Sequence, residues 1–208
     1  MKKIHLILSL FFLFAFANFS FGQIIGSGHD FSGNAWANNR ICIVCHTPHN
    51  GTAMANAPLW NRELSATATY TMYSSLTFDG AASAVDPIAT SSSNSRLCLS
   101  CHDGTVALEN FGGVTTGTTF ITGSANIGTD LSNDHPISFT YDDALSTTDP
   151  GLWQPSTTAA LGGTIQSEML FGDQLECASC HNVHDNTNGF FLRMDNTGSA
   201  LCLTCHNK

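Results

Sequence analysis

The sequence predicts a mostly irregular fold, in which short α-helices and a minor β-hairpin are organised around groups that are not protein. Three observations lead to this prediction. The chain repeats the pattern C-x-x-C-H four times. Its stretches 79–96 and 112–134 are dense in Ser, Thr, Gly and Ala, as loops typically are. Few apolar side chains are then left to build a core for a chain of 208 residues.

The first 22 residues resemble a secretory signal peptide. A charged start is followed by an apolar run (4–16) and by small residues at positions −3 and −1 before Gln23. The alternative is a membrane anchor, but the run is short for a bilayer span and no stop-transfer pattern follows. We therefore expect export of a mature chain, residues 23–208, that has no membrane span. The expected final location is extracellular or at the cell surface, with the periplasm as the alternative.

The charge of the predicted mature chain argues against a nucleic-acid partner. Once the leader is removed, five basic residues remain against sixteen acidic ones, a net charge of −11. The basic residues are scattered singly, so they form no patch that could follow a phosphate backbone. They are Arg40, Arg62, Arg96, Arg193 and Lys208.

Local patterns predict the remaining elements. The stretch "PLWNREL" (58–64) is expected to form a helical turn. The stretch "TATYTMYSSLTF" (67–78) partly alternates apolar and polar residues, which predicts the hairpin. Each C-x-x-C-H pattern is expected on a short helix.

The four repeated patterns carry the chemistry. C-x-x-C-H is the signature of covalent c-type haem attachment, in which two thiols add to the porphyrin and the histidine binds its iron. A disulfide framework does not require a histidine after each pair. Structural zinc usually combines two pairs and gives no reason to repeat C-H four times. The motifs are Cys42-Ile-Val-Cys45-His46, Cys98-Leu-Ser-Cys101-His102, Cys177-Ala-Ser-Cys180-His181 and Cys202-Leu-Thr-Cys205-His206.

The histidine count fits four haems whose irons each bind two imidazoles. Outside the leader the chain has eight histidines, and four irons have eight axial positions. The four that follow a Cys pair are the proximal ligands. Met54, Met72, Met169 and Met194 are rival ligands, but none recurs between the two halves of the chain. The predicted distal ligands are His29, His49, His135 and His184.

The motifs recur in the same order in both halves of the chain. A lone histidine is followed by C-x-x-C-H-x-x-H and then by L-C-L-x-C-H, first within about 23–111 and again within about 112–208. This order indicates duplication of a two-haem unit. His49 and His184 each lie three residues after a proximal histidine, on the same side of a helical turn. Each is therefore expected to bind the iron of a different haem from its neighbour.

Several segments resemble the multihaem c-type cytochromes with doubled C-x-x-C-H motifs. The resemblance rests on "HDFSG", "ICIVCHTPHNG", "APLWNREL", "NDHPISFTYDD", "LECASCHNVHD" and "SALCLTCHNK". It extends to outer-surface cytochromes of metal-respiring bacteria that polymerise into filaments, or nanowires. It implies bis-histidine haems in a continuous chain, with one axial histidine donated by the neighbouring subunit. On this resemblance His49 is the candidate donor, and the haem at His206 its acceptor.

These observations predict a protein that transfers electrons and catalyses no reaction of its own. Its partners would be further copies of itself, redox proteins or extracellular electron acceptors. One alternative is a monomeric periplasmic shuttle. Another is a multihaem reductase with one open haem, which would need a vacant axial position and nearby catalytic side chains.

Overall fold

The computed structural model describes residues 23–54 and 57–208. The predicted leader, residues 1–22, lies outside the described residues. Within the described part, no helix is long and apolar enough to cross a membrane.

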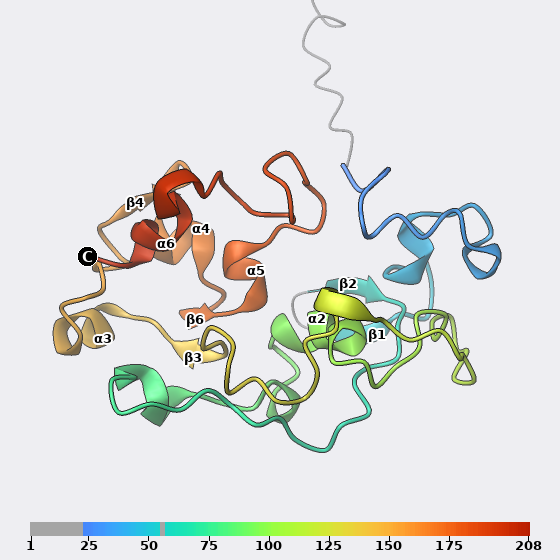
Figure 1. Cartoon of the computed structure of the whole chain (residues 1–208), viewed down its shortest axis with the longest axis horizontal. Coiled ribbons are helices and arrows are strands. Elements are labelled where there is room, and N and C mark those ends of the chain that lie inside the picture. The colour runs from blue at the N-terminus through green and yellow to red at the C-terminus, as the bar shows by residue number, and fades with distance from the viewer. Residues whose placement is uncertain (1–22, 55–56) are drawn as a thin grey trace, which may run out of the picture.

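Most of the described chain is irregular, as predicted, and its helices are short (Figure 1). The longest has eight residues. The α-helices are α2 (Ser95–His102), α3 (Asp143–Thr148), α4 (Ile165–Met169), α5 (Cys177–Cys180) and α6 (Ala200–Cys205). The 3-10 helices are η1 (Ala35–Ala37), η2 (Cys42–Val44), η3 (Asp79–Ser83), η4 (Pro87–Ala89), η5 (Gly123–Ala125) and η6 (Thr197–Ser199).

Three small antiparallel sheets of two strands each complete the described fold. Two are local hairpins, and the third joins segments that are distant in the sequence, with Phe139 opposite Leu175. The paired strands are β1 (Thr52–Met54) with β2 (Ala57–Trp60), β3 (Phe139–Thr140) with β6 (Gln174–Leu175), and β4 (Ala159–Ala160) with β5 (Gly163–Thr164).

Two local predictions are wrong. The stretch 58–64 forms no helical turn, because its first residues belong to β2. The stretch 67–78 forms no hairpin, because its polar groups bind other segments. The amide of Tyr70 donates to Asp86 Oδ2 (2.9 Å), and Thr71 pairs with Asp130 in an isolated bridge. Side-chain acceptors thus replace the cross-strand partner that alternation suggested.

The core is divided into three clusters, and each lies beside a C-x-x-C-H motif. The largest includes Tyr141 and Ile165, and Cys180 and Cys205 pack against it. It belongs to the part of the molecule that contains α4, α5 and α6, at the left of Figure 1. The other clusters are Ala37, Val44 and Phe111, against which Cys45 packs, and Tyr70, Leu99 and Leu131.

The parts of the chain before and after residue 112 share an interface. Helix α2 contacts α5, and the Ser95 hydroxyl accepts a hydrogen bond from the amide of Cys177 (3.0 Å). Ser95 also donates to the buried carboxylate of Glu176. The division into two-haem units at about 23–111 and 112–208 stays a prediction.

Candidate haem-binding sites

In three motifs both cysteines lie on a short helix, as predicted, whereas in the first motif Cys42 begins the helix and Cys45 directly follows it. The helices are η2, α2, α5 and α6. In three motifs the histidine amide donates to the carbonyl of the first cysteine, at 2.8 Å for His46, 3.1 Å for His181 and 2.9 Å for His206. In the other motif, His102 is the last residue of α2. One helical turn therefore carries both sulfur atoms and leads directly into the imidazole.

The described residues give no support to the disulfide and zinc alternatives. All eight cysteines lie in the described part of the chain, and all are free. Within residues 23–54 and 57–208, no group of three or more His, Cys, Asp or Glu side chains is arranged to hold a metal ion.

Three of the four proximal imidazoles bind a backbone carbonyl through Nδ1. The distances are 3.0 Å from His46 to Pro58 O, 2.7 Å from His102 to Ala125 O and 2.8 Å from His181 to Phe190 O. A carbonyl only accepts hydrogen bonds, so Nδ1 carries the proton and donates. Nε2 then has a free lone pair, which is the form that an iron ligand needs.

Two of these acceptor carbonyls lie at strained backbone. Leu59, directly after Pro58, has φ of 57°, and Phe190 has φ of 49°. Such values cost about 1 kcal/mol or more for a residue with a side chain, and they persist where surrounding structure enforces them. The strain turns each carbonyl toward a proximal histidine. Sequence reasoning missed these acceptors, because a backbone carbonyl leaves no signature in the residue type.

Three pairs of imidazole rings have the separation that one iron requires. A metal–imidazole bond is about 2 Å long and a ring nitrogen lies about 1 Å from its centroid, so two axial rings have centroids roughly 6 Å apart. Each pair combines a predicted proximal histidine with a predicted distal one. The centroid distances are 6.1 Å for His46 and His184, 5.9 Å for His29 and His102, and 6.2 Å for His135 and His206.

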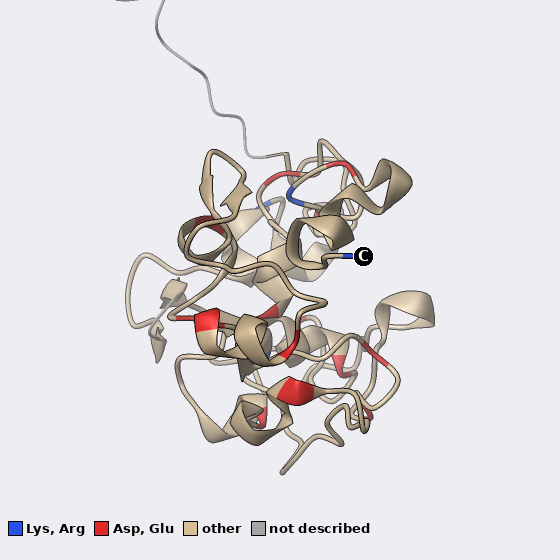
Figure 2. Ribbon diagram, turned by 90° about the vertical axis from the view of Figure 1, so that its left-hand side faces the viewer, with Lys and Arg blue, Asp and Glu red and all other residues tan. Residues whose placement is uncertain are grey.

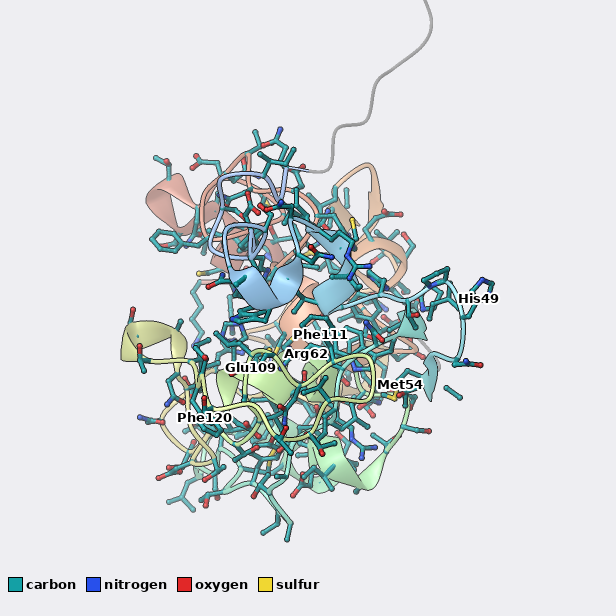
Figure 3. The ribbon with its side chains drawn as sticks, turned by 90° about the vertical axis from the view of Figure 1, so that its right-hand side faces the viewer. His49, Met54, Arg62, Glu109, Phe111 and Phe120 are labelled. Carbon is teal, nitrogen blue, oxygen red and sulfur yellow. The ribbon has the colours of Figure 1, made fainter. Side chains whose placement is uncertain are left out.

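His181 and His49 are left outside these pairs. His181 binds Phe190 O through Nδ1, and His49 is exposed and projects from the molecular surface (Figure 3). The resemblance suggested the haem at His206 as the acceptor of His49. Because His206 lies beside His135 instead, the expected acceptor becomes the haem at His181.

Burial favours the uncharged forms of the ligand groups. It lowers the pKa of His29 to about 4, helped by the nearby imidazoles of His102, His181 and His184. It also lowers the pKa of His206, and His135 adds to the effect. A neutral imidazole binds metal, whereas a protonated one does not.

The cysteines of successive motifs are close enough to influence one another. Burial raises the pKa of Cys45 to about 11; Cys101 adds to the rise and the Arg62 charge opposes it. Cys98 and Cys177 form a side-chain hydrogen bond. Burial, and then the charge of Cys180, raise the pKa of Cys205 to about 12. These contacts join the first motif to the second, the second to the third and the third to the fourth.

The last motif is anchored although it lies at the end of the chain. The carbonyl of Cys205 accepts hydrogen bonds from the Trp153 amide (2.8 Å) and the Tyr141 hydroxyl (3.2 Å). The amide of Asn207 donates to Gly151 O (2.8 Å). The segment 151–153 therefore holds the motif in place beside the largest core cluster.

Unpartnered polar atoms and exposed apolar side chains near the motifs fit the binding of haem. Among the described residues, the buried Nε1 of Trp60 and Nε of Arg96 have no hydrogen-bond partner. Buried polar atoms without partners are rare and often mark a missing group. Leu203, between the last two cysteines, is 43% exposed, and Phe190 is 87% exposed. Porphyrin rings at the motifs would cover such apolar surface.

Three of the four rival methionines pack against other side chains. Met169 is buried in the largest core cluster, and Met194 accepts a hydrogen bond from the Thr204 hydroxyl at 3.4 Å. Met72 packs beside Leu99 and Leu131. These three side chains serve as packing groups.

Comparison with known proteins supports the haem assignment. A family model described as the doubled CXXCH motif matches residues 171–208, which contain the third and fourth motifs. No curated protein matches the chain. The family match supports a multihaem c-type cytochrome that binds haem c covalently and transfers electrons.

Proposed function

We propose that the protein carries electrons along four covalently attached haems, each held by two histidines, and that it polymerises into an extracellular filament. The observation that carries the proposal is the separation of about 6 Å between proximal and distal imidazoles in three pairs. Each of the three pairs combines histidines that are distant in the sequence. Chance packing of surface side chains does not explain three such pairs. In this scheme, the fourth pair of axial histidines consists of His181 of one subunit and His49 of the next.

When bound, haem supplies the Fe(III)/Fe(II) couple. The residues of this chain fix its surroundings. Backbone carbonyls hold His46, His102 and His181 in the tautomer that offers Nε2 to the iron. Two neutral imidazoles would hold each iron, which would favour a low potential and leave no position for a substrate.

Contacts between motifs support transfer from one end of the subunit to the other. Cys45 lies near Cys101, and Cys98 hydrogen bonds with Cys177. The charge of Cys180 acts on Cys205. Four sites joined in this order would form one continuous path rather than two separate pairs.

Self-assembly would account for both histidines that lie outside the three imidazole pairs, His49 and His181. His49 is exposed and has no ring contact among the described residues. His181 is oriented by the carbonyl of Phe190, as His46 and His102 are by other backbone carbonyls. Donation of His49 to the neighbouring subunit's iron would complete the fourth pair and link the subunits. The sparse, scattered basic residues (Figure 2) agree with a partner that is not nucleic acid. Final electron acceptors would then be redox proteins or external oxidants.

A second candidate follows from the same unpaired His181. In a monomer, the haem attached at Cys177 and Cys180 would keep one axial position open, as a reductase requires. In a monomeric shuttle, this haem would instead need a second axial ligand other than His49. Carbon monoxide binds an open ferrous haem and leaves a bis-histidine haem unchanged, so it separates these candidates.

The experiment compares the native protein with His49→Ala and with Ser124→Ala, a control at another exposed position. Haem is counted by its pyridine spectrum, filaments are scored by negative-stain microscopy, and the reduced protein is exposed to carbon monoxide. We expect four haems in all three proteins, filaments in the native protein and the control, and one carbon-monoxide-binding haem only in His49→Ala. Filaments of His49→Ala would rule out this donor. A native protein that remains monomeric and binds carbon monoxide would favour the reductase.

A further inference from the structure

Arg62 is a charged side chain in the interior of the protein. It is 2% exposed and is among the largest fully buried side chains. Nη1 donates to Leu108 O at 2.7 Å and Nη2 donates to Ala107 O at 3.0 Å. Two carbonyls of the segment after α2 therefore hold the guanidinium of Arg62, which is labelled in Figure 3, in a fixed orientation.

No carboxylate in the described part of the chain forms an ion pair with Arg62, and its buried Nε has no hydrogen-bond partner there. Two acidic residues close to these segments bind elsewhere. Glu63 accepts from the Asn110 side chain at 2.7 Å, and Glu109 accepts from the amides of Thr118 and Thr119. Burying an arginine without an opposite charge is costly. The charge of Arg62 is therefore not neutralised by a carboxylate of the described chain, and it acts on the groups that lie beside it.

Both of the first two motifs lie beside this charge. The preceding residue, Asn61, donates its amide to Cys45 O at 2.9 Å and its side chain to Ile43 O at 2.5 Å. On the other side, Ala107 and its neighbour follow α2, which carries the second motif.

We propose that Arg62 is a potential-setting residue, which raises the reduction potentials of the haems attached at the first and second motifs. The proposal rests on the proposed function, because it requires haem at these motifs. Reduction adds one electron to an Fe(III) haem and gives Fe(II). A fixed positive charge in a poorly polarisable interior favours the state with the extra electron.

Three variants test the proposal in the haem-loaded protein. Arg62→Met removes the charge and keeps much of the apolar volume, whereas Arg62→Lys keeps the charge. Arg40→Met removes the charge of an exposed arginine and is the control. Spectroelectrochemical titration should show two of the four transitions of Arg62→Met shifted toward lower potential. A roughly tenfold change in each Fe(II)/Fe(III) equilibrium corresponds to about 59 mV for one electron.

Arg62→Lys should retain most of the native potentials, and Arg40→Met should match the native protein. A four-haem Arg62→Met protein with native potentials would overturn the proposal. If Arg62→Met does not accumulate, Arg62→Gln removes the same charge and keeps a side-chain amide that can donate to a carbonyl. Native potentials in Arg62→Gln would overturn the proposal. A native protein with fewer than four haems would instead count against the proposed function.

Discussion

The imidazole rings of His46 and His184 lie with their centroids 6.1 Å apart, although they belong to the first and third motifs of the sequence. His184 would therefore hold the haem of His46 and not that of its neighbour His181. One haem between His46 and His184 would tie the beginning of the described chain to its end. The same arrangement recurs between His29 and His102, so ligation would cross-link a fold that has little regular structure.

Replacing His184 by alanine should open the first haem without releasing it. The two thioether bonds and His46 remain, so four haems should still be counted by the pyridine spectrum. The reduced variant should bind carbon monoxide at one additional haem, because one axial position has lost its ligand. Val183→Ala, a change at the adjacent exposed residue, should bind no more than the native protein. Unchanged carbon monoxide binding in His184→Ala would contradict the pairing.

Tyr70 should stabilise the fold through its hydroxyl. That hydroxyl donates to Asp103 Oδ2 at 2.6 Å, and both residues are about 95% buried. Tyr70→Phe leaves a buried carboxylate with one donor fewer, which should lower the free energy of unfolding by about 1–3 kcal/mol. Tyr73→Phe is the matched control, because the Tyr73 ring packs against Phe78 and no hydrogen bond of its hydroxyl is found in the described chain. Equal stability of the two variants in urea unfolding would contradict the role of the hydroxyl.

Gly51 should tolerate no side chain. A Cβ atom at this position would lie 2.6 Å from Leu59 Cα, which is backbone and cannot rotate away. Gly51→Ala should therefore displace the strained Pro58–Leu59 segment that orients His46, and lower the free energy of unfolding by about 1–3 kcal/mol. Gly33→Ala adds the same atom in open space and should change stability little. Thermal unfolding of both variants measures the difference, and a stable Gly51→Ala protein would refute the close approach.

The Asp143 carboxylate should make folding more favourable above pH 3.8 than below it. The Ser156 hydroxyl donates to Oδ2 at 2.6 Å, and this bond, more than any other, lowers the pKa of Asp143 below 3.8. A carboxylate with a lowered folded pKa stabilises the protein above its unfolded pKa, and this contribution is lost as the pH falls through the folded pKa. Ser156→Ala should raise the Asp143 pKa in a carboxyl NMR titration.

Ser146→Ala is the control for that titration, because the Ser146 hydroxyl donates to the backbone carbonyl of Asp143 and not to its carboxylate. The pKa of Asp143 should stay at its native value in this variant. An equal rise of the Asp143 pKa in both variants would contradict the role of the Ser156 hydroxyl and attribute the effect to the α3 helix as a whole.

The sequence predicted the motif helices and the irregular fold because those features depend on local patterns. C-x-x-C-H fits one helical turn, and segments rich in Ser, Thr and Gly form loops. The hairpin at 67–78 failed because the acceptors of its amides, such as Asp86, lie outside the segment. The role of Pro58 O could not be foreseen, since any residue has a carbonyl. Arg62 was counted only as one of five scattered basic residues, and its burial depends on the tertiary fold.

Spectroscopy of the irons in the native assembly tests the central claim most directly. That claim is that histidine fills both axial positions of every haem, so that the protein only relays electrons. We predict that the fully oxidised protein, with four haems counted per chain, gives only low-spin bis-histidine ferric signals by electron paramagnetic resonance. A high-spin signal from a vacant or water-bound iron in the assembled protein would contradict the claim.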